Sequence, residues 1–281
     1  MKKLIVNADD FGLHTMINQA ILKGHVTGCI TSTSLMAMGN GFDEAVHMAL
    51  KTPSLDVGVH LTLVAERPVL PADKVKTLVD KNGVFATDYI QFILRYVQGK
   101  IDLNEVYNEF SAQIERIINS GIPISHLDSH QHLHVLPQIT DICITLAKKY
   151  KIKAMRIPAE PYLFMGGYNA DVKRIIGKCG LTFLANRARK KVIKHSIHVP
   201  NHFFGMLAGG HLNEHYLKNI ITSLPEETSE IMIHPGHDTK VLQSVFPWEY
   251  QWGNELNAVI SPSVMKLIRE EDVKLSSFGE L

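Results

Sequence analysis

The chain has 281 residues, a formal net charge of +1 at pH 7, and 45% hydrophobic and 20% charged residues. This balance lacks the basic footprint of a protein that binds nucleic acid or an anionic membrane surface, so we expect neither as a partner. No apolar run reaches the length of a transmembrane helix and the start MKKLIVNADDFG does not resemble a secretory signal, so we expect a cytoplasmic protein.

Short apolar runs alternate with amphipathic stretches along the chain. The runs have the length of buried strands and read KLIVNADD, CITSTSLMA, DVGVHLTLV, ISHLDSH, KAMRIP, SIHVP and EIMIHPGH. Helical periodicity is found at residues 15–27, 42–51, 103–120, 137–150, 213–223 and 261–271. Pro137 suits a first helical position and Asn213 suits an N-cap. This alternation predicts an α/β fold whose seven or so parallel strands form a closed or nearly closed, irregular barrel.

Two segments interrupt the alternation of strands and helices. Residues 65–100 contain prolines and the turn-like DKNG, and residues 159–195 form the second interruption. We expect both to form loops and extra helices over one end of the barrel. No linker divides the chain, so residues 1–281 are predicted to form a single domain with these two insertions.

Polar side chains end several of the predicted strands. They are Asp9 and Asp10, His60, Asp128 and His130, Arg156, and His234. In a parallel barrel all carboxyl ends of the strands lie on one face, which is where active sites are found. Residues that are scattered in the sequence are therefore expected to converge, and this convergence is the main indication of an enzyme.

Asp9 and Asp10 are neighbours at the end of the first predicted strand. Adjacent strand residues point to opposite sides, so both can serve one site only if the chain turns there, and Gly12 supplies freedom for a turn. The structural alternative is that Asp10 caps the helix that begins near His14. Their position directly after the apolar LIV favours a functional role.

The densest group of histidines lies in HLDSHQHLHVLP, residues 126–137. Strand residues two apart are separated by about 6.6–6.8 Å, and a metal draws its nitrogen ligands to about 2.0–2.1 Å. Histidines four apart can therefore share a metal only if the strand ends between them, and Pro137 places that end nearby. We expect one or two of His130, His132 and His134 to bind metal and the others to support the ligands or contact substrate. A polar loop entering a helix is the structural alternative.

The other candidates each have a structural alternative as well. His60, in the apolar VGVHLTLV, could be a hydrogen-bonded core histidine, and Gly58 beside it suggests a close approach of another segment. His234, in IMIHPGHD, could belong to an ordinary turn, because Pro235 follows it. Arg156, in MRIP, could form a surface ion pair.

Several common catalytic motifs are absent from the sequence. There is no G-x-S-x-G, no H-E-x-x-H and no phosphate-binding glycine loop, because MGNGF and LAGGH lack the Walker lysine and hydroxyl. Chemistry through a serine nucleophile or a nucleotide is therefore disfavoured, and chemistry through a metal-activated water is favoured.

Five motifs together resemble those of the YdjC-like carbohydrate deacetylases, which include the chitooligosaccharide deacetylases. They are NADDFGL, GVHLTL, HLDSHQHLHVLP, RIP and IHPGH, and the resemblance extends from the first residues to about His237. It implies a TIM-like, often seven-stranded barrel that removes the acetyl group from an N-acetylated amino sugar with one divalent metal ion. A homodimer is left open.

The resemblance also implies roles for individual residues. The metal ligands would be Asp10, His60 and His130, the general base Asp9 and the general acid His234. Arg156 resembles the arginine that orients the base in the related polysaccharide deacetylases. His132, His134 and His237 are then candidate substrate contacts, and His134 stays open as a ligand in place of His60.

These roles are chemically consistent with hydrolysis of an amide. One carboxylate and two imidazoles leave coordination positions for a water and the acetyl oxygen. A second carboxylate removes the proton of the water, and a histidine protonates the departing amine. We expect neighbouring carboxylates to raise the pKa of His234. The family is described as magnesium-dependent, whereas a nitrogen-rich ligand set favours zinc or another transition metal.

Two other functions remain possible from the sequence. A metal-dependent phosphoesterase on a similar barrel would typically gather more ligands for two or three metals. A non-enzymatic sugar-binding or regulatory protein would bind an amino sugar without metal-dependent turnover.

Overall fold

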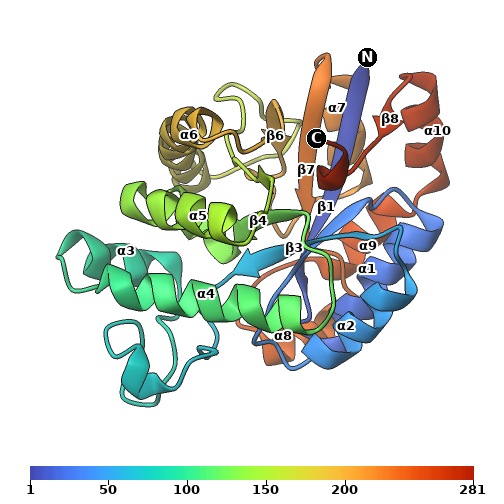
Figure 1. Cartoon of the computed structure of the whole chain (residues 1–281). Helices are drawn as coiled ribbons and strands as arrows, with labels where there is room; N and C mark the ends of the chain where they lie inside the picture. The colour runs from blue at the N-terminus through green and yellow to red at the C-terminus, as the bar shows by residue number, and fades with distance from the viewer.

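The computed structural model describes residues 1–281 as a curled parallel sheet surrounded by helices (Figure 1). The strands follow the order β5–β4–β3–β2–β1–β7–β6, and β8 pairs with β1 outside this path. All paired strands run parallel. The predicted α/β fold with a TIM-like barrel is therefore confirmed. The strands are β1 (Lys2–Phe11), β2 (Ser32–Leu35), β3 (Asp56–Leu61), β4 (His126–Ser129), β5 (Ala154–Met155), β6 (His202–Phe204), β7 (Glu227–Ile233) and β8 (Lys274–Leu275).

All six helices predicted from periodicity are present, and four more accompany them. Pro137 is the first residue of α5, and the side chain of Asn213 caps α7 by accepting a hydrogen bond from the backbone N–H of Tyr216. The helices are α1 (Thr15–Thr27), α2 (Phe42–Lys51), α3 (Tyr89–Val97), α4 (Leu103–Asn119), α5 (Pro137–Lys149), α6 (Val172–Lys194), α7 (Glu214–Thr222), α8 (Thr239–Val245), α9 (Trp252–Val259) and α10 (Pro262–Glu270). None of them combines the length and apolarity needed to cross a membrane.

The sixth predicted strand, SIHVP, forms only a single bridge. The backbone N–H of His198 donates to the carbonyl of Lys153 and its carbonyl accepts the N–H of Met155 in β5, but Pro200 has no N–H to continue the ladder. The chain then moves to the other edge of the sheet, where β6 pairs with β7. This irregular segment hydrogen-bonds to both edges and closes the barrel without a regular strand.

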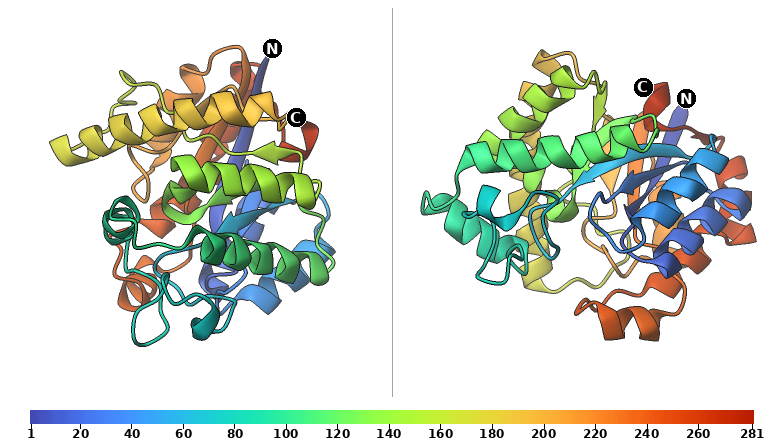
Figure 2. Two further views of the ribbon diagram at one scale, coloured as in Figure 1. Left: turned by 60° about the vertical axis from the view of Figure 1, so that its left-hand side comes forward. Right: turned by 60° about the horizontal axis from the view of Figure 1, so that its bottom comes forward.

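The last residues of the chain cover the end of the barrel at which the strands begin. Phe278 stacks on the ring of His126 with a centroid distance of 3.7 Å. A Cβ atom on Gly58 would lie 2.3 Å from that ring, which confirms the close approach predicted at this glycine. Both chain termini lie at this end (Figures 1 and 2). The opposite end, where β1, β3, β4 and β7 finish, is free to carry a site.

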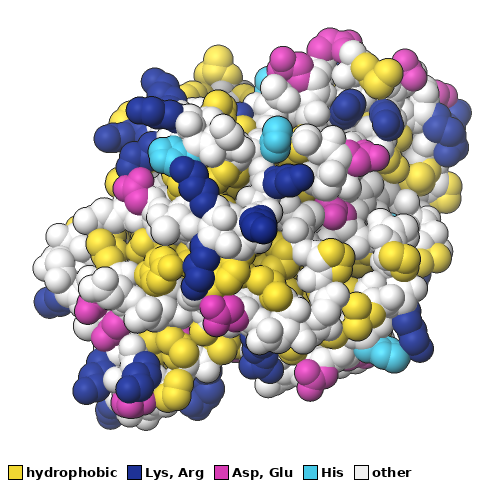
Figure 3. Space-filling view, in the orientation of Figure 1, with side chains coloured by type: hydrophobic (Ala, Val, Ile, Leu, Met, Phe, Trp, Pro, Cys, Tyr) yellow, Lys and Arg dark blue, Asp and Glu magenta, His cyan; other side chains and the backbone are white.

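The two predicted insertions contain α3 and the long helix α6. Helices α4, α5 and α6 follow one another along one flank of the barrel (Figure 2, left). Both insertion helices expose apolar side chains, such as Leu94 on α3 and Ile176 on α6. Figure 3 shows Lys and Arg side chains gathered where α6 lies in Figure 1. One cluster of 67 buried apolar residues extends from β1 to the segment after α10.

Candidate active site

Asp9 and Asp10 lie buried at the end of β1, where the chain turns. Asp10 has a φ of 67°, in the left-handed region, and the register between β1 and β2 shifts between Ala8 and Phe11. The turn allows both carboxylates to join one cluster although they are adjacent. Asp10 does not cap α1, because His14 does so through its Nδ1.

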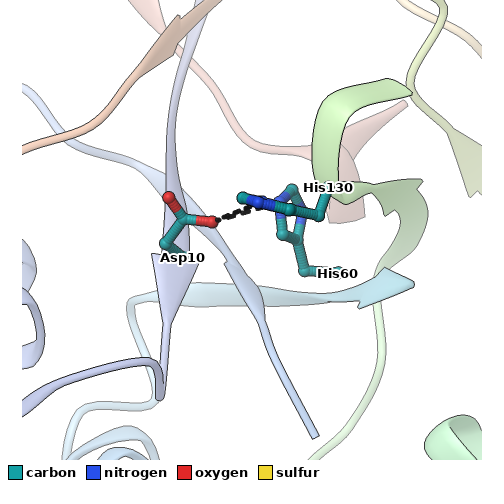
Figure 4. A group of neighbouring side chains, drawn as sticks. All are labelled: Asp10, His60 and His130. Atoms are coloured by element: carbon teal, nitrogen blue, oxygen red, sulfur yellow. Dashed lines mark hydrogen bonds and ion pairs between the residues drawn. The ribbon is translucent and has the colours of Figure 1, made fainter. Parts of the chain in front are cut away.

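Asp10, His60 and His130 converge from β1, β3 and the end of β4 (Figure 4). Oδ1 of Asp10 lies 3.0 Å from Nδ1 of His130 and 3.4 Å from Nε2 of His60. The second carboxylate oxygen of Asp10 and Nε2 of His130 are buried without a hydrogen-bond partner. One carboxylate and two imidazoles with unsatisfied buried atoms are a donor set that fits a divalent transition metal or magnesium.

The three histidines of HQHLH separate because β4 ends at Ser129. Gln131 and His132 adopt left-handed backbone angles, with φ of 53° and 58°, which turn the chain sharply. His130 therefore faces Asp10, and His132 lines the neighbouring cavity.

His134 is turned away from the cluster of Asp10, His60 and His130. Its Nδ1 lies 2.7 Å from Oγ of Ser129 and its Nε2 lies 3.1 Å from the carbonyl oxygen of Arg156. Both ring nitrogens are thus engaged, and His134 does not line the cavity. This geometry favours His60 over His134 as a metal ligand and supports a structural role for His134.

Arg156 lies fully buried in the barrel, so it does not form a surface ion pair. Its Nη1 and Nη2 donate to the two oxygens of Asp9 at 2.7 Å each, and its Nε donates to Glu230 at 2.6 Å. Nη1 also lies 2.7 Å from Asp128. Asn7 donates a further hydrogen bond to Asp9. This network fixes the orientation of the Asp9 carboxylate.

Asp128 connects Arg156 to the cluster of Asp10, His60 and His130. It lies 2.8 Å from Nδ1 of His60 and accepts a hydrogen bond from Ser34. Burial lowers the pKa of His60, but Asp128, Asp9 and Asp10 outweigh it and raise that pKa to about 10. Without a metal His60 is therefore protonated at neutral pH, and a bound cation would replace this proton.

A second group, Asp9, His60 and Asp128, also has the composition of a metal site. Arg156 already occupies it, because the same Nη1 lies 2.7 Å from both carboxylates. A fixed guanidinium supplies the positive charge that a second metal ion would bring. The arrangement therefore favours a site for one metal.

His234 follows the last residue of β7 and is buried at the wall of the same cavity. Its Nδ1 has no hydrogen-bond partner, and its ring lies 4.9 Å from that of Tyr250. Burial lowers the pKa of His234 below 6.5, although Asp10 and Asp9 act to raise it. The expectation from the sequence that neighbouring carboxylates raise this pKa is therefore wrong, since desolvation dominates.

The cavity beside the cluster has a volume of about 580 Å³. Its polar lining includes Asp9, His60, His130, His132 and His234, and Tyr89, Leu181, Met206, Met232 and Tyr250 add apolar surface. His237 is not among the lining residues; it lies beyond the turn, half-buried, and its backbone N–H donates to Met16.

Reasoning from the sequence missed the segment FPWEYQW, residues 246–252. Trp248 lies 5.3 Å from the ring of His130, and Tyr250 lies beside His234. Trp252 is fully buried and begins α9. Aromatic residues at every second position were the available signal, but nothing near them resembled a catalytic motif.

Comparison with known proteins identifies the family of this chain. The family model described as YdjC-like protein matches residues 3–270. Proteins named carbohydrate deacetylase from Thermoanaerobacter pseudethanolicus and Vibrio cholerae serotype O1 are 27% identical over 281 residues and 30% identical over 282 residues. The first alignment covers 100% of both chains, and the second covers 99% of this chain and 96% of the relative.

A solved structure from Enterococcus faecalis V583, provisionally described as a cellobiose-phosphate cleavage protein, is 27% identical with a TM-score of 0.78. The match covers 99% of this chain and 98% of that one. The fold and the full-length matches agree with the motifs found in the sequence. The chain belongs to the family of YdjC-like proteins, which includes these carbohydrate deacetylases.

Proposed function

We propose that the protein is a metal-dependent hydrolase that removes the acetyl group from an N-acetylated amino sugar or chitooligosaccharide. The observation that carries the proposal is the buried cluster of Asp10, His60 and His130, whose two histidines line a cavity together with Asp9 and His234. Such a cavity can hold a sugar ring, because small-molecule sites combine apolar walls with a few fixed polar groups. The names of the relatives support the carbohydrate and the acetyl group.

Asp10, His60 and His130 would hold one divalent ion, which when bound supplies Lewis acidity to the acetyl carbonyl and to a water. Asp9 accepts the proton of the attacking water. Arg156 holds both oxygens of Asp9 and keeps the carboxylate correctly oriented.

His234 donates a proton to the amide nitrogen as the C–N bond breaks. Acetate and an amine leave, and the new C–O bond comes from the water. An amide nitrogen is a poor leaving group, so the acid is as necessary to the reaction as the metal. His132 is the remaining histidine of the cavity and is proposed to contact the sugar, whereas the positions of His134 and His237 do not support such a contact.

Two observations bear on the metal. The family resemblance points to Mg²⁺, and the two imidazole ligands favour Zn²⁺ or another transition ion.

A phosphoesterase with two or three metals is disfavoured, because Arg156 fills the second candidate position. A sugar-binding protein without activity is the remaining alternative.

The test is release of acetate from N,N′-diacetylchitobiose by protein that has been treated with chelator and reloaded with Mg²⁺, Mn²⁺ or Zn²⁺. We expect turnover only with metal, and one ion per chain in the active protein. An Asp10→Asn variant is the matched control. Binding of the sugar without acetate release under every metal would favour the non-enzymatic alternative, and release of phosphate from a sugar phosphate would favour the phosphoesterase.

A further inference from the structure

Glu255, in the first turn of α9, is a fully buried carboxylate without a cationic partner. Its Oε2 accepts the backbone N–H of His234 at 2.5 Å, and its Oε1 accepts the backbone N–H of Leu212 at 3.1 Å. Burying a carboxylate that is not paired with a cation is costly, and such groups concentrate at functional sites. The position of Glu255 beside His234 suggests what it does.

The carboxylate joins three segments at the wall of the cavity. It connects the end of β7 to the loop before α7, and two backbone hydrogen bonds reinforce these connections. Gly236 donates to the carbonyl of Trp252 at 3.1 Å, and Gln251 donates to the carbonyl of Gly210 at 2.6 Å. The backbone of His234 is therefore held firmly relative to α9.

Glu255 is also the carboxylate nearest to the imidazole of His234. Its Oε2 lies 3.9 Å from Nδ1, and that nitrogen is buried with no other partner. The separation exceeds a hydrogen bond but lies within ion-pair range, and catalytic contacts are often long before substrate binds. An acceptor on the Nδ1 side leaves Nε2 as the nitrogen available to a substrate.

We propose that Glu255 is a positioning residue that shares one proton with His234 and keeps His234 ready to act as the acid. The proposal rests on the proposed function for the role of His234. The other charged or titratable groups that act on the pair are Asp9 and Asp10 from β1, His60 from β3, His130 from the turn after β4, and Tyr250.

A proton shared with Glu255 explains how His234 can act as an acid at neutral pH. Burial lowers the pKa of His234 below 6.5, so alone it would hold little proton at neutral pH. Burial also raises the pKa of Glu255 to about 8. At 3.9 Å the two groups are close enough to titrate as a pair, which would retain one proton up to about pH 8 and pass it to the imidazole when the amine leaves.

The test compares Glu255→Gln with the wild type in the metal-loaded full-length protein. The basic limb of the kcat profile on N,N′-diacetylchitobiose should move from near pH 8 to below 6.5, with KM nearly unchanged. At pH 7.5 this shift corresponds to a loss on the order of ten-fold in kcat. An acetate ester with a good leaving group should lose much less. In a His234→Ala background, Glu255→Gln should cause little further loss, because the two residues act as a unit.

Glu160→Gln is the matched control. Glu160 is also buried and accepts backbone N–H groups, from Gly205, Met206 and Leu207, but it does not approach His234. It should change stability without moving the basic limb. Two results would show that Glu255 only supports the fold. One is a basic limb of the kcat profile at the same pH in wild type and Glu255→Gln. The other is a loss in kcat from Glu255→Gln that is as large in the His234→Ala background as in the wild type.

A second measurement does not depend on turnover. The imidazole nitrogens of His234 can be titrated by ¹⁵N NMR in protein loaded with Zn²⁺, with and without Glu255→Gln. The variant should lower the pH at which His234 loses its proton, and an unchanged titration would overturn the proposal even if deacetylation is found. If the variant does not fold, a wild-type basic limb below pH 6.5 would overturn the proposal in the same way. Absence of deacetylation together with a shifted titration would instead refute the proposed function.

Discussion

Arg156 binds Asp9 through two parallel hydrogen bonds, with Nη1···Oδ2 and Nη2···Oδ1 distances of 2.7 Å each. The guanidinium comes from the residue after β5 and the carboxylate from β1, so the pair spans the interior of the barrel. A planar fork matches both carboxylate oxygens, and a single ammonium cannot do so. The orientation of Asp9 therefore depends on the shape of Arg156 as well as on its charge.

Arg156→Lys should lower kcat by roughly 10²-fold, because the charge is kept but the Asp9 carboxylate is no longer fixed at two points. Metal content should stay normal, since Arg156 does not contact Asp10 or His130. Steady-state kinetics with parallel metal analysis of the purified variant provides the measurement. Near-normal kcat in Arg156→Lys would mean that charge alone suffices at this position.

Asp9 and Asp10 should respond differently to the same substitution. Asp10→Asn is expected to weaken metal binding, because Asp10 is the carboxylate that lies between His60 and His130. Asp9→Asn should keep the metal and the substrate but lose most turnover, about 10²–10⁴-fold, as expected for a general base. Isothermal titration with Zn²⁺ and acetate release separate the two effects, and near-normal turnover in Asp9→Asn would remove its assignment as the base.

The sequence predicted six of the eight strands, six of the ten helices and the convergence of polar residues, because those depend on local periodicity and on a property shared by all parallel barrels. It could not predict which of three histidines faces Asp10. That choice depends on the left-handed angles of Gln131 and His132, which no local propensity requires.

Long-range partners explain the other differences. The pKa of His234 depends on how deeply its ring is buried, and Glu255 is recognisable only because α9 packs against the end of β7. The predicted strand SIHVP fails because its proline interrupts the ladder just where the chain must change edges. The sequence of this segment shows the proline, but it does not show where the two edges of the sheet lie.

His60→Ala and His134→Ala should separate a ligand from a structural histidine. His60→Ala is expected to abolish tight binding of a divalent ion, because it removes one of three proposed ligands. His134→Ala should retain the metal but lower the free energy of unfolding by about 2–4 kcal/mol, since it removes a buried ring and that ring's hydrogen bonds to Ser129 and to the carbonyl of Arg156. Metal titration and urea unfolding measure the two quantities, and the reverse pattern would make His134 the ligand.

The metal-free protein should lose stability as the pH rises above neutrality. The pKa of His60 is about 10 in the folded protein and about 6.5 in an unfolded chain. The contribution of protonated His60 to the free energy of unfolding is therefore complete below pH 6.5 and is lost as the pH rises towards 10. Glu255, with a pKa raised by burial to about 8, acts in the same direction at lower pH. Unfolding by urea in the presence of a chelator should show a falling free energy between pH 7 and 10.

A bound metal should reverse the part of this loss that comes from His60. Binding replaces the proton on the imidazole, so the metal-bound form no longer depends on that proton, and metal affinity itself increases as competing protons leave. We therefore expect the stability gained from excess Zn²⁺ to be larger at pH 8.5 than at pH 6.5. His60→Gln is the control, because it removes the titrating group together with the ligand and should abolish this difference. A gain from Zn²⁺ that is the same at both pH values in the wild type would mean that His60 does not exchange its proton for the metal.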